Sequence, residues 1–78
     1  MREKTQKLIV TFHTTAAAMA MELRCMAQGI PGRVLPVPRE ISADCGMCWC
    51  SPVQERERIA AELRASGIEI EGVYEMLL

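Results

Sequence analysis

Two stretches of the chain carry the signals of helix ends, and they alternate with β-prone runs. The first helix is expected to begin at Thr14 or Thr15, whose hydroxyl groups can cap it, and to end at Gly29. The second is expected to begin at a capping box opened by Ser51 and to end at Gly67. The β-prone runs are residues 7–12, 33–37, 46–50 and 68–76. The predicted order is therefore strand, helix, strand, strand, helix, strand.

This order predicts an α+β fold of the ferredoxin-like βαββαβ type, a two-layer sandwich with antiparallel sheet order 4-1-3-2 and both helices on one face. The chain has 78 residues, so residues 1–78 are expected to form a single domain with an ordered core over about 7–76. Pro36 cannot donate a ladder hydrogen bond, which predicts an edge position for the second strand.

Two lines of apolar residues run along the first predicted helix. The wider one is expected to face the core and consists of Ala16, Met19, Ala20, Leu23, Met26 and Ala27. The narrower one consists of Ala18, Met21 and Cys25 and is expected at the margin of the core or against a partner chain.

The charge and the apolar pattern exclude several classes of protein. The formal net charge is -1 with scattered basic residues, which argues against a nucleic-acid partner. We find no secretory signal and no run of about 20 apolar residues that could span a bilayer. A cytoplasmic location is therefore expected, and thiols stay reduced there, so reactive thiols or metal ligation are the expected uses of the cysteines.

Three of the four cysteines, Cys45, Cys48 and Cys50, fall within six residues. In the predicted topology the end of the first strand, the start of the first helix and the loop before the third strand meet at one edge of the sheet. We therefore expect His13, Thr14, Thr15, Cys45 and Gly46 to be neighbours. A helix N-terminus, His13 and Arg39 nearby would favour a Cys45 thiolate, and Gly46 would let a small anion or a partner's sulfur approach closely.

Cys48 and Cys50 are two apart on a predicted strand, so they are expected on one face, with Met47 and Trp49 on the other. Their spacing of roughly 6.6 Å would strain a disulfide between them. Packing as small buried side chains is the favoured interpretation for these two and for Cys25. A Cys45/Cys48 redox pair stays open, as does a zinc site built from Cys45, Cys48 and Cys50 with Cys25 or His13, although we expect no metal or cofactor.

The segments 12–17 and 29–33 and the run Pro36-x-Pro38-Arg39-x-x-Ser42-x-x-Cys45-Gly46 resemble a small bacterial family of selenium/sulfur carrier-like proteins. The resemblance covers the chain from Leu8 to about Tyr74. It implies that Cys45 accepts sulfur or selenium, with Pro38, Arg39, Ser42 and Gly46 as the surrounding motif. Cysteines at positions 48 and 50 are not a general feature of the family, so a role as resolving thiols stays open for them.

The leading hypothesis is accordingly a carrier rather than an enzyme. Cys45 would hold the chalcogen as a persulfide-type adduct, receive it from a donor such as a cysteine desulfurase and pass it to an acceptor protein. A small zinc-binding or regulatory ferredoxin-like module is the first alternative, and a dithiol redox protein is the second. The choice between sulfur and selenium and the formation of a homo-oligomer stay open.

Overall fold

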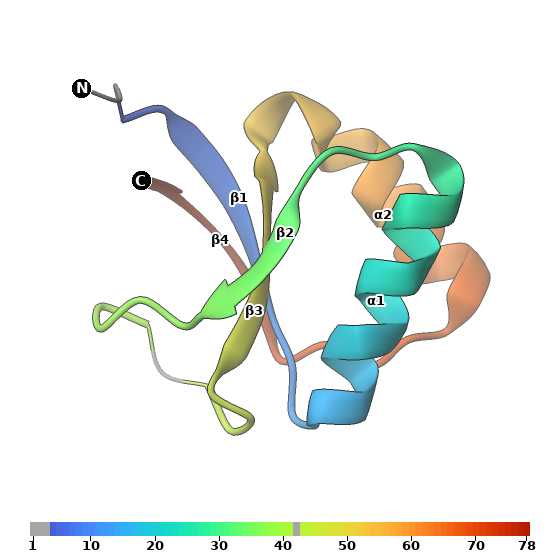
Figure 1. The fold of residues 1–78 in the computed structure, drawn as a ribbon, viewed down its shortest axis with the longest axis horizontal. Coiled ribbons are helices and arrows are strands. Elements are labelled where there is room, and N and C mark those ends of the chain that lie inside the picture. Colours follow the sequence, from blue (N-terminus) through green and yellow to red (C-terminus); the bar gives the residue numbers. More distant parts are fainter. Residues whose placement is uncertain (1–3, 42) are drawn as a thin grey trace.

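The computed structural model describes residues 4–41 and 43–78, and its secondary structure follows the predicted alternation (Figure 1). The elements in chain order are β1 (Gln6–Thr11), α1 (Thr15–Gln28), β2 (Arg33–Pro36), β3 (Met47–Pro52), the short 3-10 turn η1 (Val53–Glu55), α2 (Arg56–Ser66) and β4 (Gly72–Leu77). The expected α+β class, with one four-stranded antiparallel sheet and two helices, is confirmed. None of the helices in the described ranges is both long and apolar enough to cross a membrane.

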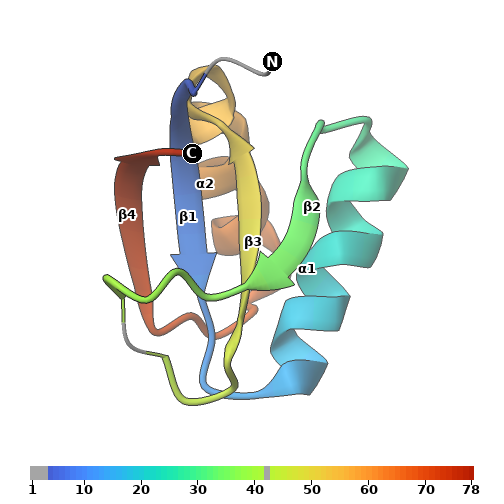
Figure 2. The ribbon, with the colours of Figure 1, turned by 60° about the vertical axis from the view of Figure 1, so that its left-hand side comes forward.

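The four strands lie in the order β2-β3-β1-β4, and each neighbouring pair is antiparallel. Read from the opposite edge, this is the order 4-1-3-2 expected from the sequence. Both helices lie on the same side of the sheet (Figures 1 and 2). β2, which ends at Pro36, forms one edge, as the proline predicts.

The ends of α1 follow the sequence signals. The Thr14 hydroxyl accepts a hydrogen bond from the Ala17 amide at 3.1 Å, which satisfies one of the free N–H groups of the first turn. Gly29 ends the helix with a φ of 70°. This left-handed conformation costs glycine little because it has no Cβ.

The start of the second helix was predicted wrongly. β3 continues to Pro52, η1 follows, and α2 begins only at Arg56. The Ser51 hydroxyl does not cap this helix but donates to the Pro31 carbonyl at 2.6 Å, because Ser51 is still part of the sheet and is fully buried. The last strand is also shorter than the alternation of residues 68–76 suggested, because residues 68–71 lie outside β4.

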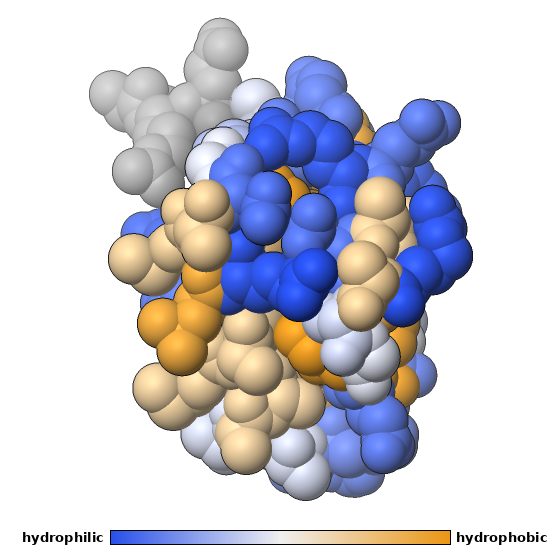
Figure 3. Space-filling view, turned by 90° about the vertical axis from the view of Figure 1, so that its right-hand side faces the viewer, coloured by the Kyte–Doolittle hydropathy of each residue, from blue (hydrophilic) through white to orange (hydrophobic). Residues whose placement is uncertain are grey.

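The expected core face of α1 was also wrong. The buried residues are the narrower line, Ala18, Met21 and Cys25, whereas Met19, Leu23 and Met26 are 54–67% exposed. The small or flexible side chains of the narrower line let α1 lie close to β3 and β2. Helical periodicity alone cannot predict which of two apolar lines on one helix faces the sheet. Figure 3, which views the helix side, shows apolar side chains at the surface.

The apolar core is divided by the sheet into two clusters. The larger one, between sheet and helices, includes Val10, Phe12, Met21, Trp49 and Ile59. The smaller one, on the other face, consists of Ile9, Cys48 and Cys50. The loop between β2 and β3 crosses this second face, where its residues Val37 and Ile41 pack over the smaller cluster (Figure 2).

Candidate functional site

Cys45 is the most accessible of the four cysteines. It is half-buried at the end of the β2–β3 loop, whereas Cys25, Cys48 and Cys50 are buried. Its sulfur accepts a hydrogen bond from the Met47 amide at 3.4 Å and can donate to the Met47 carbonyl at 3.3 Å. The thiol is thus held by the backbone at the start of β3 and stays open to solvent on one side.

Burial keeps the other thiols protonated. Loss of solvent raises the pKa of Cys25 to about 11, with a smaller contribution from the Glu62 carboxylate. The pKa of Cys48 also rises to about 11, again mainly through burial. Burial raises the pKa of Cys50 as well, although Lys7 and Arg33 oppose the change. Because the thiolate is the nucleophile, these three cysteines are poorly suited to sulfur transfer.

Gly46 sets the direction of the chain after the thiol. Its φ of +76° lies in the left-handed region, which disfavours residues with a Cβ. Its amide donates to the Ala43 carbonyl at 3.3 Å, and its carbonyl accepts from the Val37 amide at 3.0 Å. A Cβ built at this position would have no described heavy atom within 4 Å, so the left-handed backbone, and not a lack of space, is what favours glycine here. A role for Gly46 in the approach of an anion or a partner's sulfur stays a prediction.

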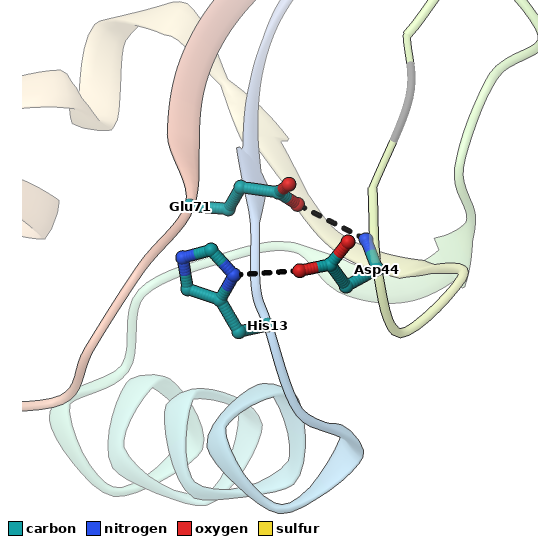
Figure 4. A group of neighbouring side chains, drawn as sticks. All are labelled: His13, Asp44 and Glu71. Atoms are coloured by element: carbon teal, nitrogen blue, oxygen red, sulfur yellow. Dashed lines mark hydrogen bonds and ion pairs between the residues drawn. The ribbon is translucent and has the colours of Figure 1, made fainter.

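The residue before Cys45 is held from two sides (Figure 4). The His13 ring, just after β1, donates from Nδ1 to the Asp44 carboxylate at 2.8 Å. The Asp44 amide donates to the Glu71 carboxylate, just before β4, at 3.1 Å. The loop that carries Cys45 is therefore fastened to the ends of two neighbouring strands.

These contacts extend the neighbourhood expected from the sequence. His13 does lie at the Cys45 loop, but its ring is bonded to Asp44, and both recorded hydrogen bonds of the Cys45 sulfur are with Met47. Thr14 caps α1 and Thr15 is its exposed first residue. Asp44 and Glu71 were not among the site residues predicted from the sequence. Asp44 could have been predicted because it directly precedes Cys45 in the sequence. Glu71 could not, because residues 68–76 were predicted to form a strand.

Acidic neighbours surround the His13 ring. The hydrogen bond to Asp44 is the main cause that raises the pKa of His13 above its ordinary value of 6.5, and the Glu71, Asp44 and Glu69 carboxylates add to it. Because the His13 ring is exposed to water, its interactions with the carboxylates are screened, which limits the rise in its pKa. The protonated, cationic form of His13 is therefore favoured at this edge of the sheet.

The rest of the expected motif lies on the same loop. Pro38 closes a turn, because its carbonyl accepts from the Ile41 amide at 2.9 Å. Arg39 is exposed at the tip of this turn, and no ion pair of Arg39 is found among the described residues. Ser42 lies outside the described residues. The expected stabilisation of a Cys45 thiolate by Arg39 stays a prediction.

Cys48 and Cys50 lie where the alternation of β3 predicts, in the smaller cluster, with Met47 and Trp49 packed in the larger one. Cys45 packs against the larger cluster, whereas Cys48 packs in the smaller one, although the charge of Cys45 is close enough to contribute to the raised pKa of Cys48. Within residues 4–41 and 43–78, the one set of side chains close enough to share a metal ion contains no cysteine. The expected alternatives of a Cys45/Cys48 pair and a three-cysteine zinc site therefore gain no geometric support.

Fold and site together define a small α+β protein with one accessible thiol. The family model described as "Putative Se/S carrier protein-like" matches residues 7–75, and the chain belongs to this family. The resemblance to selenium/sulfur carrier-like proteins seen in the sequence is thereby confirmed. Neither the curated proteins nor the solved structures contain a significant match to the chain.

Proposed function

We propose that the protein carries sulfur or selenium as a persulfide-type adduct on Cys45 and passes it to an acceptor protein. Membership in the carrier-like family supports the class of function. The choice of residue rests on one observation, that Cys45 is only partly buried while burial raises the pKa of each of the other three thiols. The fold that presents this thiol is assigned to the ferredoxin-like type.

The transfer step is a thiol exchange at the outer chalcogen atom. The Cys45 thiolate attacks the terminal sulfur of a persulfide on the donor enzyme, and the donor's S–S bond breaks. The new S–S bond is on Cys45, and the donor leaves as a thiolate, so no external oxidant or reductant is needed. A cysteine desulfurase is a donor with the required chemistry, and the acceptor takes the outer atom by the reverse exchange.

The surroundings of the Cys45 sulfur suit this exchange. The Met47 amide donates a hydrogen bond to the sulfur, which stabilises the Cys45 thiolate that attacks the donor and that leaves again when the acceptor takes the outer atom. Partial exposure of Cys45 leaves it accessible to a donor or an acceptor. All four cysteines are free, as is usual for proteins of reducing compartments, and a cytoplasmic location is part of the proposal.

The test is anaerobic incubation with a cysteine desulfurase and radiolabelled cysteine, followed by removal of free label. We expect about one labelled sulfur per chain, released by a reducing agent. Cys45→Ser should abolish the label, whereas Cys25→Ser, as the matched buried control, should retain it. Undiminished labelling of the Cys45→Ser protein would overturn the assignment. If the protein repeatedly converted the labelled sulfur without holding a stable adduct, it would instead be an enzyme.

A further inference from the structure

The side chains that fasten the Cys45 loop form a compact set of metal-ligating atoms. His13, Asp44 and Glu71 come from three separate segments, and one ligand atom of each lies within 4.8 Å of the other two (Figure 4). The His13 Nδ1 and the Asp44 Oδ2 are 2.8 Å apart. Two ligands on adjacent corners of an octahedron with metal–ligand distances of about 2.1 Å are separated by about 3.0 Å. The pair therefore already has the spacing that one ion requires.

The charge at this edge also favours a cation. Asp44 and Glu71 face one imidazole, and Glu69 is close enough to act on the same ring. Elsewhere in the described chain Glu55, Glu62 and Glu75 each pair with an arginine, but no arginine or lysine is within ion-pair distance of Asp44 or Glu71. Up to three carboxylates are thus balanced by one histidine, and a divalent ion would neutralise this excess.

The ligand types limit which ion fits. One imidazole nitrogen and two carboxylates suit a first-row transition metal such as Mn²⁺ or Zn²⁺ better than Ca²⁺, which takes oxygen ligands only. Each carboxylate has a second oxygen, so Glu71 can bind an ion while it still accepts from the Asp44 amide. His13 and Asp44 are both more than half exposed, so the ion can enter from solvent and retain water ligands.

We propose that His13, Asp44 and Glu71 form a binding site for a divalent transition-metal ion at the base of the Cys45 loop. The ion would replace the proton that now lies between Nδ1 and Oδ2, and that proton is released to solvent. Because Asp44 directly precedes Cys45, the ion would fasten the thiol-bearing loop more firmly to β1 and β4. The proposal does not depend on sulfur or selenium transfer.

Mn²⁺ is the probe of choice, because it prefers nitrogen and oxygen ligands to thiolates and so avoids binding to the cysteines. Titration into reduced protein, followed by the electron paramagnetic resonance of free Mn²⁺, should show one saturable site per chain. In a parallel amide NMR spectrum, bound Mn²⁺ should broaden the signals of His13, Asp44 and Glu71 first. Signals of Gln6 and Leu77, at the opposite ends of β1 and β4, should broaden much less.

The two variants to compare are Glu71→Gln, which changes a proposed ligand, and Glu69→Gln, the matched control at a nearby carboxylate outside the site. Both remove one negative charge near His13, and in Glu71→Gln the new side-chain amide oxygen can still accept from the Asp44 amide. We expect Glu71→Gln and His13→Gln to weaken Mn²⁺ binding at least tenfold, and Glu69→Gln to weaken it by less than threefold. Equal losses in both glutamate variants would mean a diffuse acidic patch, and absence of saturable binding to the wild type would mean no site. Either result would overturn the proposal.

Discussion

Selective alkylation offers a direct test of the difference between Cys45 and the buried cysteines. In the fold the thiols of Cys25 and Cys48 have pKa values of about 11, compared with 9.0 for an unperturbed cysteine. At about pH 7.5 the thiolate fraction is then roughly 1 in 3,000, against roughly 1 in 30 for an unperturbed thiol. Ionisation alone should therefore slow alkylation about 100-fold relative to the unfolded chain, and burial should slow it further.

The assay is a short pulse of iodoacetamide on native protein and on protein in urea, followed by trypsin and mass spectrometry. Trypsin cleaves after Arg24 and Arg33, which isolates Cys25, and after Arg39 and Arg56, which leaves Cys45, Cys48 and Cys50 on one peptide. In a protein with both Cys45→Ser and Cys50→Ser, any label on that peptide reports Cys48. The wild-type peptide should be labelled rapidly, and the peptide of the double variant at least 100 times more slowly than in urea.

Labelling of Cys48 or Cys25 in the native protein within tenfold of the unfolded rate would refute this reasoning. It would mean that the sheet face under the β2–β3 loop, or the contact of α1 with the sheet, opens far more often than the buried positions imply. Cys45 would then lose its claim to be the reactive thiol.

Three further predictions concern stability, measured by urea unfolding. Met21→Ala should lower the free energy of unfolding by about 2–5 kcal/mol, because Met21 is buried. Leu23→Ala should lower it by less than about 0.5 kcal/mol, because Leu23 is exposed. The reverse order would show that the wider apolar line of α1 faces the core. Gly46→Ala should lower the free energy of unfolding by about 1–2 kcal/mol, because the left-handed backbone at this position disfavours a residue with a Cβ. Gly32→Ala should lower the free energy of unfolding by more than Gly46→Ala does, because the new Cβ would lie 2.5 Å from the Trp49 ring and 2.6 Å from the Cys50 carbonyl oxygen. Equal losses in the two variants would contradict this close approach. Raising the pH from 9 to 11 should lower the free energy of unfolding by about 2 kcal/mol for each of Cys25 and Cys48, because their folded pKa values are raised and the unfolded chain ionises first. The loss should shrink in Cys48→Ala, and an unchanged pH dependence would refute the shift.

The sequence predicted the elements that carry strong local signals. The Thr14 cap, the Gly29 stop and the edge position of β2 each depend on one residue whose conformational preference is decisive, so tertiary packing did not override them. The faces of Cys48 and Trp49 followed from the two-residue period of a strand.

The errors arose where packing decides between locally equal alternatives. Both apolar lines of α1 satisfy helical periodicity, and only contact with the sheet selects Met21 over Leu23. Ser51 has the residue type of a helix cap, but its hydroxyl is used by the Pro31 carbonyl across the sheet, a partner 20 residues away. Glu71 could not be assigned to the site because its link to Asp44 spans 27 residues and has no local signature.

The loop between β2 and β3 performs two tasks with one stretch of chain. It presents Cys45 at its end, and through Val37 and Ile41 it shields the Ile9, Cys48 and Cys50 cluster from water. Displacement of this loop would therefore open the sheet face that holds Cys48 and Cys50, and the number of accessible thiols would rise from one toward three. The position of a single segment thus sets how many of the chain's thiols a reagent or partner can reach.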